Sequence, residues 1–205
     1  GVAAAWESSS RGVFVMRCVE CDSFAAAYAT KFWPDVPEFR LDYVRLPDAG
    51  FDERLAMAEK TAGMACPHCG RVLTDEQRFA MIDEAGENGW WLHRGQTLDP
   101  VRGIEGEMEP TNKVGFWDHG LTLKVSPAAD LARGLEEALI KFERSGGRRV
   151  KELREFMSKQ LGEIFEGKAD IEGVTAADLQ KRAREERGLR IGEFRHAIVK
   201  PNRSE

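Results

Sequence analysis

The chain has 205 residues, of which 42% are apolar and 32% are charged, and its formal net charge is -5. This composition is typical of an ordinary soluble protein with one large core or two small ones, and the net charge gives no bulk argument for nucleic-acid binding. No apolar run approaches the roughly 20 residues that a membrane span requires, and no basic segment marks a secretion signal at the start. Because the first residue is Gly1 and not Met, we expect a segment cut from a longer polypeptide.

The first third of the chain predicts short strands around a helix. Residues 13–16 are an apolar run of β-forming residues directly before the first cysteine, and they predict a strand. Residues 24–32 are ambiguous between helix and strand. Residues 51–62 have a helix-forming composition, and Gly63 follows where that helix can end.

A capping box predicts the next helix. Thr74 and Gln77 have the spacing of a reciprocal N-terminal cap, and we expect the helix to run to about residue 85. Residues 90–92 then predict a strand. Residues 94–113 are rich in Gly, Pro and charged residues and predict a loop or hairpin.

The pattern changes to helices near Ser126. This serine is predicted to cap a helix that begins at Pro127. Apolar side chains then recur at steps of four, four and three, which is one helical face, at Leu131, Leu135, Leu139 and Phe142. A second amphipathic helix is predicted over residues 148–165, so that the two form an antiparallel hairpin. A third, basic helix is predicted from Thr175 to about residue 187.

The four cysteines fall in two C-x-x-C pairs, Cys18 with Cys21 and Cys66 with Cys69. A C-x-x-C turn brings two sulfurs to one point, and four thiolates are a preferred tetrahedral ligand set for structural zinc. We therefore predict that all four cysteines bind one Zn2+ ion, which holds two distant segments of the chain together.

The surroundings of the two pairs favour this interpretation. Gly70 relieves crowding after the second pair, and Asp22 stands at the equivalent position of the first pair, where Asp tolerates a left-handed backbone. Residues 22–65 separate the pairs, a longer stretch than the roughly 15–20 residues of a compact zinc ribbon. Because closure entropy rises slowly with loop length, a ribbon with a long insertion is still acceptable.

Redox chemistry is an alternative for these thiols. Thioredoxin-like oxidoreductases also contain a Cys-Pro-His-Cys sequence such as residues 66–69, but they place the first cysteine at a helix N-terminus. Here the expected helix begins only at Thr74, which favours a zinc knuckle. We expect His68 to point away from the metal. The other histidines are expected to be surface or packing residues: His93, His119 and His196.

These elements predict an α+β fold, in which a small zinc-ribbon-like β domain with an inserted helix is followed by an α-helical hairpin region. The predicted ribbon domain covers residues 1–122 and has its long insertion at residues 23–64. A helical linker domain is predicted over residues 123–195, and a tail over residues 196–205.

We find no complete catalytic motif in the sequence. The nearest approach to a phosphate-binding loop is Gly162 to Gly167-Lys168, but Ala169 replaces the hydroxyl that would hold magnesium. The acidic residues lie in predicted loops or on polar helix faces, and we expect solvated surface at Asp83, Glu84, Glu105, Glu107, Glu109, Glu136 and Glu137. By itself the segment is not expected to be an enzyme.

The order of these features resembles the middle of lambda-type phage terminase large subunits, the GpA family of DNA-packaging motors. The similar elements, in the family's order, are residues 6–11 before the strand and first cysteine pair, Trp33-Pro34, residues 66–70, residues 76–81 leading to 89–91, residues 115–121 and residues 153–163. Two elements depart from the family: Ser158 stands where Asn is usual, and Val19-Glu20 replaces Pro-His.

The resemblance implies a parent protein of a phage or prophage, in the host-cell cytoplasm, with an ATPase upstream and a metal-dependent nuclease downstream. Neither catalytic set lies in this chain. The implied function is therefore a zinc-stabilised structural linker that takes part in DNA packaging. The implied partners are double-stranded DNA, the flanking ATPase and nuclease domains, and the portal or the small terminase subunit. No membrane partner is expected.

A stand-alone zinc-ribbon protein that binds DNA or RNA is the alternative function. Its support is a basic run near the C-terminus: Lys181, Arg182, Arg184, Arg187, Arg190 and Arg195. Glutamates interrupt this run, which also fits a solvated helix face. A redox protein that uses Cys66 and Cys69 is the third hypothesis.

Overall fold

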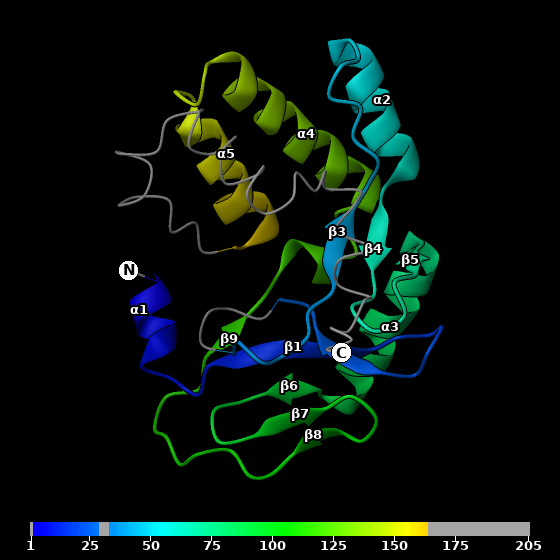
Figure 1. Ribbon diagram of the computed structural model, residues 1–205. Helices are drawn as coiled ribbons and strands as arrows, with labels where there is room; N and C mark the ends of the chain where they lie inside the picture. The colour runs from blue at the N-terminus through cyan, green and yellow to red at the C-terminus, as the bar shows by residue number, and fades with distance from the viewer. Residues whose placement is uncertain (1, 29–32, 164–205) are drawn as a thin grey trace, which may run out of the picture. The chain divides into compact units, whose positions relative to one another are not determined.

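The computed structural model describes residues 2–28 and 33–163, which form a mixed α/β structure of several small sheets and helices (Figure 1). The chain divides into two compact units. Among the described residues, unit 1 comprises residues 2–28, 33–40 and 64–126, and unit 2 comprises residues 41–63 and 127–163. Within the described residues, no helix is long and apolar enough to cross a membrane.

Strand β1 (Gly12–Arg17) is the centre of the main sheet of unit 1. Strands β2 (Phe24–Ala26) and β6 (Trp91–Leu92) pair with it antiparallel, and β9 (Phe116–Trp117) pairs with it in parallel. Gly12 to Met16 are all buried, which explains why this strand is a continuous apolar run and not an alternating one. The predicted strand over residues 13–16 is confirmed, and the ambiguous stretch after the first cysteine pair begins as a strand.

Two hairpins follow along the chain. Strands β4 (Gly63–Ala65) and β5 (Val72–Leu73) pair antiparallel, and the turn between them contains the second cysteine pair. Strands β7 (Thr97–Asp99) and β8 (Gly103–Glu105) confirm a hairpin within residues 94–113. The main sheet and the short helix α1 (Val2–Glu7) share one core cluster, whose buried members are Trp6, Val13, Val15, Ala26 and Leu92.

Helix α3 (Asp75–Asn88) begins with the predicted capping box. The Thr74 hydroxyl accepts a hydrogen bond from the Gln77 backbone N–H at 3.3 Å, and the Gln77 side chain accepts one from the Thr74 backbone N–H at 3.0 Å. The helix runs a few residues beyond its predicted end. It stops at Gly89, which has a φ of 65° and donates its N–H to the carbonyls of the last turn.

Arg78 of α3 is fully buried and organises the segment that leads out of unit 1. Its guanidinium donates to the carbonyl of Leu121 at 2.6 Å and to that of Ser126 at 2.8 Å. Leu121 belongs to the short 3-10 helix η1 (Gly120–Thr122). The predicted cap of the next helix is wrong by one residue, because Pro127 is the N-cap of α4 (Ala128–Arg144) and no side chain bonds there.

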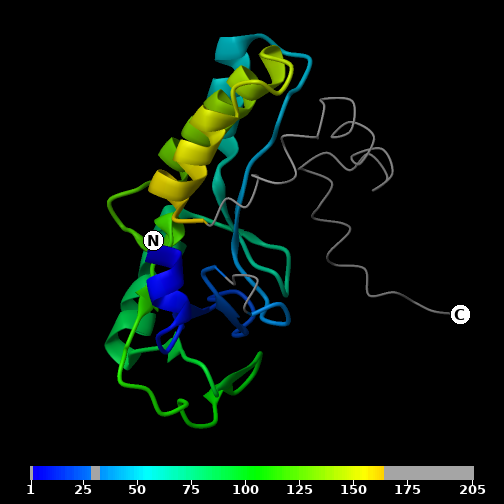
Figure 2. The same cartoon turned by 90° about the vertical axis from the view of Figure 1, so that its left-hand side faces the viewer.

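Unit 2 is built from α2 (Phe51–Thr61), α4 and α5 (Val150–Phe156), which lie side by side (Figure 2). Helix α5 continues into a π-helical turn, Met157–Leu161, and ends at Gly162 with a φ of 75°. The predicted helix over residues 51–62 and the predicted hairpin of two helices are both confirmed. The second helix of the hairpin stops short of residue 165 because Gly162 adopts the left-handed conformation.

Strand β3 (Arg40–Asp42) stands where the chain passes from unit 1 to unit 2. Residues 41–63, which stand between the two cysteine pairs in the sequence, belong to unit 2. The insertion at residues 23–64 stays a prediction. The domain bounds 1–122, 123–195 and 196–205 stay a prediction. The predicted third helix and the tail lie outside the described residues.

Candidate metal centre

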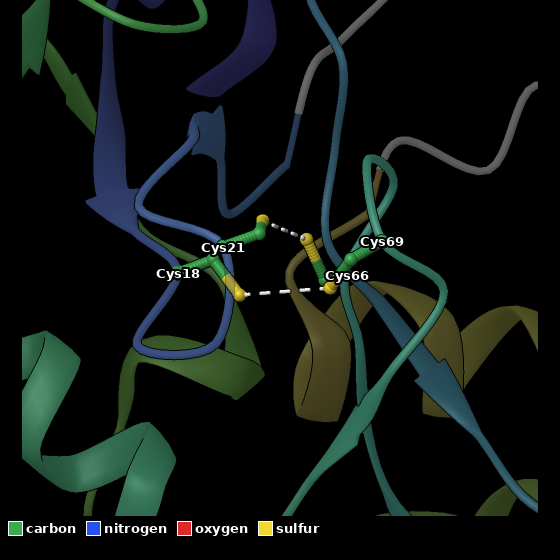
Figure 3. Close-up of side chains that lie close together, drawn as sticks. All are labelled: Cys18, Cys21, Cys66 and Cys69. Atoms are coloured by element: carbon green, nitrogen blue, oxygen red, sulfur yellow. Dashed lines mark hydrogen bonds between the residues drawn. The ribbon is translucent and has the colours of Figure 1, made fainter.

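The sulfur atoms of all four cysteines lie within 4.8 Å of one another (Figure 3). The Sγ atoms of Cys18 and Cys69 are 4.0 Å apart, and those of Cys21 and Cys66 are 3.8 Å apart. Both separations exceed the roughly 2.05 Å of a disulfide bond. A tetrahedral ion with metal–sulfur bonds of about 2.3 Å has ligand atoms about 3.8 Å apart, so the cluster has the dimensions of one metal site.

Two turns of matching geometry present the sulfurs. In the first turn, the Cys18 N–H donates to the Ser23 carbonyl at 2.9 Å, and the Asp22 N–H donates to the Cys18 carbonyl at 2.8 Å. In the second turn the equivalent bonds are Cys66 to Arg71 at 2.9 Å and Gly70 to Cys66 at 3.0 Å. This shared pattern is what places both side chains of each pair on the same side of the backbone.

Both turns need a left-handed residue after the second cysteine. Gly70 has a φ of 69°, and Asp22 has a φ of 58°, one of the few positive values among the described residues other than glycine. Asp is among the residues that adopt this conformation at modest cost because its short polar side chain bonds locally. The predicted equivalence of Asp22 and Gly70 is therefore confirmed.

The secondary structure explains how segments distant in sequence meet. Cys18 follows the last residue of β1 directly, and Cys66 follows the last residue of β4. Strand β5 begins shortly after Cys69 and returns the chain antiparallel to β4. An ion held at this point would join the end of the central strand of the main sheet to the turn between β4 and β5, which belong to a second sheet with β3.

Burial decides the acid–base behaviour of the thiols. Cys18 and Cys66 are buried, and this burial raises the pKa of Cys18 to about 11 and raises the pKa of Cys66 as well. Burial also acts to raise the pKa of Cys21, but hydrogen bonds from the backbone and hydroxyl of Ser23 outweigh it, and the net shift is downward. Because burial disfavours the thiolate forms of Cys18 and Cys66, a bound cation is what would stabilise four thiolates together.

The arrangement fits a structural metal better than redox or hydrolytic chemistry. Four thiolate ligands complete a tetrahedron and leave no open position for water or substrate. A reactive thiol has a lowered pKa at a helix N-terminus, whereas the pKa of Cys66 is raised and α3 begins only at Asp75. The four cysteines therefore form a site that can hold a metal ion, as the sequence predicts.

None of the three described histidines contributes to the cluster. The Nε2 atom of His68 lies 3.0 Å from the Phe24 carbonyl, so its ring is held by the backbone of β2. His93 contacts the Ser10 hydroxyl at 2.9 Å, and burial lowers its pKa. His119 is buried and accepts a hydrogen bond from the Leu121 N–H at 3.1 Å. His196 lies outside the described residues.

The other sites considered in the sequence lie wholly or partly beyond the described residues. The basic positions Lys181, Arg182, Arg184, Arg187 and Arg190 are all outside them, so DNA contacts there stay a prediction. The glycine-rich stretch that approaches a phosphate-binding loop starts at Gly162, which ends the π-helical turn with its N–H bonded to the Met157 carbonyl. A helix C-terminus accounts for that glycine.

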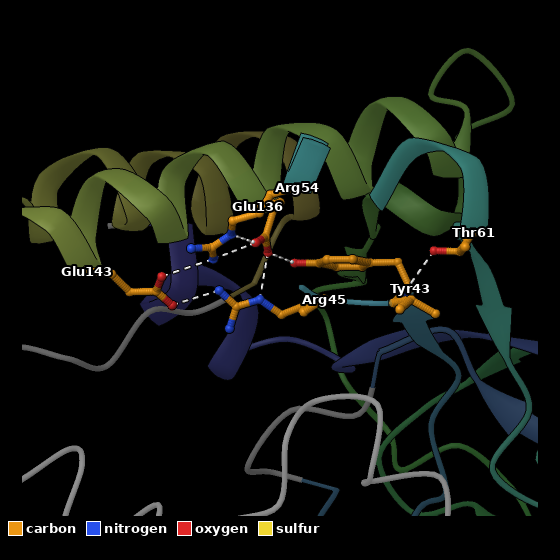
Figure 4. Close-up of polar contacts among 7 residues, drawn as sticks. Tyr43, Arg45, Arg54, Thr61, Glu136 and Glu143 are labelled. Carbon is orange, nitrogen blue, oxygen red and sulfur yellow. Dashed lines mark hydrogen bonds and ion pairs between the residues drawn. The ribbon is translucent and has the colours of Figure 1, made fainter. Parts of the chain in front are cut away.

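Unit 2 contains a buried ion network that sequence analysis missed (Figure 4). Glu136 on α4 is 0% exposed, so the expectation of solvated surface at this residue is wrong. One of its carboxylate oxygens accepts from Arg45 Nε at 2.6 Å, and the other accepts from Arg54 Nε at 2.7 Å. The Tyr43 hydroxyl donates to it at 3.1 Å. A signal was present in the sequence, because Glu136 stands four residues from buried positions on either side along α4.

Glu143 completes the network one to two turns further along α4. Its carboxylate accepts from Arg45 at 2.7 Å and from Arg54 at 3.0 Å, so two arginines face two glutamates. Burial acts to raise the pKa of Glu143, but the two arginines lower it below its usual range. Burial, and then the nearby Glu136 charge, raise the pKa of Tyr43, which stays a neutral donor. The network fastens residues 43–54 to α4.

Comparison with known proteins bears directly on the cysteine cluster. Residues 1–91 match the family described as the phage terminase large subunit gpA, ATPase domain. The resemblance to lambda-type phage terminase large subunits is confirmed. This match supports a role in phage DNA packaging, and its span includes both cysteine pairs. No curated protein and no solved structure shows significant similarity to the chain.

The span of the terminase match also bears on the predicted linker. The matching family is described as the ATPase domain, whereas the resemblance in sequence implied that these residues follow the ATPase. Residues 92–205, with α4 and α5, lie outside the match. The position of the segment between motor and nuclease therefore stays a prediction.

Proposed function

We propose that this chain is a zinc-stabilised structural segment of a phage terminase large subunit, and that it works in DNA packaging as a linker without a catalytic centre of its own. The observation that carries the proposal is the four-cysteine cluster inside the span that matches the terminase family. A metal site that joins β1 to the β4–β5 hairpin gives the segment stiffness, which a mechanical linker requires.

Zinc is the ion that suits this ligand set. Four soft thiolates in a tetrahedral arrangement favour zinc or iron. Zinc binds four thiolates tightly and has no redox chemistry of its own. The N–H of Glu20 points to the Cys18 sulfur at 3.4 Å, which helps to stabilise a thiolate bound to metal. A zinc-ribbon-like arrangement of two turns around one Zn2+ ion follows from this assignment.

The course of the chain supports a linking role. The segment 41–63 leaves unit 1 and returns through β4, and Cys66 follows immediately after that strand. The ion would thus hold the returning end of the excursion to the end of β1, so that a displacement of residues 41–63 reaches the centre of the main sheet. This continuity is suited to transmitting movement, and the work itself would be supplied by the parent protein.

The partners of the parent protein follow from the same assignment. We propose double-stranded DNA, the flanking ATPase and nuclease domains, and the portal or small terminase subunit as partners, in the cytoplasm of the host cell. The basic positions from Lys181 to Arg190 are the proposed DNA contacts in the C-terminal part of the chain.

Metal analysis of the purified chain tests the zinc assignment. We expect one zinc ion for each chain, and loss of that ion in Cys69→Ser. The control is His68→Gln, which changes a residue of the same turn and should keep the zinc. A metal-free chain with a Cys66–Cys69 disulfide would refute the zinc site and favour the redox hypothesis.

Activity measurements test the absence of a catalytic centre. We expect the zinc-loaded chain to hydrolyse no ATP and to cleave no DNA. Either activity, retained after repeated purification, would refute the proposal of a purely structural segment. A genomic neighbourhood without a portal gene would favour the stand-alone nucleic-acid-binding protein.

A further inference from the structure

The turn between α4 and α5 carries a concentration of positive charge. The cationic residues of this basic turn, all exposed, are Arg144, Arg148, Arg149, Lys151 and Arg154. Between residues 144 and 154 the only acidic residue is Glu152, whereas the chain as a whole has a net charge of -5. The basic turn is therefore a local reversal of the overall charge, and it lies within the described residues.

The acidic groups nearest in sequence pair only in part with the basic turn, and Glu155 pairs with Lys159 outside it. Glu143 directs its carboxylate to Arg45 and Arg54, on the side of α4 that faces α2. Glu152 reaches Arg149 only at 4.0 Å. In the described part of the chain, Arg148 and Lys151 form no ion pair. The ion network of unit 2 thus engages the Glu143 carboxylate, and Arg148 and Lys151 keep their charges without an ion partner among the described residues.

The backbone of the turn is held in one conformation. The Gly146 and Gly147 N–H groups donate to the carbonyls of Glu143 and Phe142, each at 3.0 Å, and both glycines have positive φ values. The Ser145 hydroxyl accepts from the Arg149 N–H at 2.9 Å. Because these N–H groups are already bonded within the turn, a ligand would be bound by the side chains, which a fixed backbone presents together.

Guided by this surplus of charge, we infer that the basic turn binds the phosphate backbone of double-stranded DNA, an inference that rests on the proposed function in DNA packaging. Guanidinium groups match phosphate oxygens in a two-pronged geometry, and contacts of this kind position DNA without reading its sequence. No large apolar residue described between 144 and 163 is highly exposed. A protein partner needs an apolar centre in its interface, whereas a phosphate backbone does not.

The test is binding of the full zinc-loaded chain to a short fluorescein-labelled DNA duplex, measured by anisotropy over a range of salt concentrations. The variant Arg148→Gln/Lys151→Gln removes two unpaired cations from the turn. The matched control Lys60→Gln/Lys113→Gln removes two exposed lysines elsewhere and changes the net charge equally. We expect the turn variant to bind roughly tenfold more weakly and to lower the salt slope by about two, since each lost phosphate contact releases one counterion fewer.

A duplex of shuffled sequence should bind equally well, because the contacts are to phosphates. Far-UV circular dichroism should be unchanged in both variants, because none of the four replaced side chains forms an ion pair in the described structure. Binding that survives in the turn variant but is lost in Lys181→Gln/Arg184→Gln would overturn the inference and place the contact in the C-terminal run.

Three further results would overturn the inference. The first is an equal loss of affinity in the turn variant and the control, which would reflect net charge alone. The second is unchanged DNA binding with lost binding to polyglutamate, which would assign the turn to an acidic protein. The third is a chain that binds no DNA at all. The zinc content of the same preparation tests the metal assignment separately. A negative result for DNA binding therefore does not affect the zinc assignment.

Discussion

Replacement of Glu136 by Gln removes one buried negative charge and preserves the size and shape of the side chain. Both Arg45 and Arg54 donate to this carboxylate, which is 0% exposed. Removing one partner of a buried ion pair costs about 3–5 kcal/mol, because the opposite charge stays buried without compensation. Gln keeps one oxygen as an acceptor and Glu143 still faces both arginines, so we expect the lower end, about 3 kcal/mol.

Glu143→Gln is the matched control for this prediction. The two glutamates bind the same two arginines from the same helix, but the side chain of Glu143 is 42% exposed. Water can replace much of what the arginines lose there, and exposed ion pairs contribute only about 0.2–1 kcal/mol. The two replaced side chains therefore differ mainly in burial. The structure predicts that the loss in free energy of unfolding is several-fold larger for Glu136→Gln than for Glu143→Gln.

Thermal and urea unfolding of the full chain, followed by circular dichroism, measures both variants. A change of 1 kcal/mol shifts the melting temperature by roughly 2–4 °C in a chain of this size, so Glu136→Gln should lower it by roughly 6–12 °C. Glu143→Gln should lower it by no more than about 4 °C. Equal shifts in the two variants would refute the reasoning, because burial would then not control the energetics of the network.

Three other predictions address the metal, pH and packing. A chelator or Cys66→Ser should raise hydrogen exchange in β1 and β4 before it does in α4, because metal binding supplies folding free energy locally; simultaneous exchange would contradict this. The pKa of Glu143 is lower in the folded state than in the unfolded state, so the unfolded state binds more protons as the pH falls. The free energy of unfolding of the wild type should therefore exceed that of Glu143→Gln above about pH 5, and the difference should shrink below about pH 4. A difference that is constant with pH would argue against this. Gly12→Ala should cost about 1–3 kcal/mol in urea unfolding, because its Cβ would lie 2.9 Å from the Gly115 carbonyl and 2.6 Å from the His93 ring; a neutral effect would show that β9 can move aside.

Local signals in the sequence were enough to predict a cluster of four cysteines and the start of α3. A C-x-x-C turn fixes its own geometry, so Cys18, Cys21, Cys66 and Cys69 could be proposed as a metal-binding set without knowledge of the fold. The capping box at Thr74 is likewise complete within four residues. Such features involve neighbours in sequence, and this is why composition and spacing reveal them.

Polar contacts between distant residues were not predictable in the same way. Arg78 stands on a helix whose composition reads as amphipathic, yet it is fully buried because three backbone carbonyls near residues 121–126 accept its hydrogen bonds. No residue near Arg78 in the sequence indicates that these carbonyls accept its hydrogen bonds. Glu136 lies between the apolar residues Ala132 and Ile140 of α4, which indicates the buried face, but its partners Arg45 and Arg54 stand 91 and 82 residues away in the sequence.

The segment 41–63 brings these two kinds of interaction together. Within it, Arg45 and Arg54 bind α4 through Glu136, and shortly after it Cys66 enters the metal cluster. Buried charge thus holds the excursion to α4, and a metal ion bound by the cysteines would hold the returning strand to β1. The ion network and the cysteine cluster use separate residues in separate units. Loss of zinc should therefore leave the decrease in the free energy of unfolding caused by Glu136→Gln nearly unchanged, as expected for independent sites. A cost that fell sharply in the metal-free chain would mean that the ion network forms only when the cysteine cluster is closed.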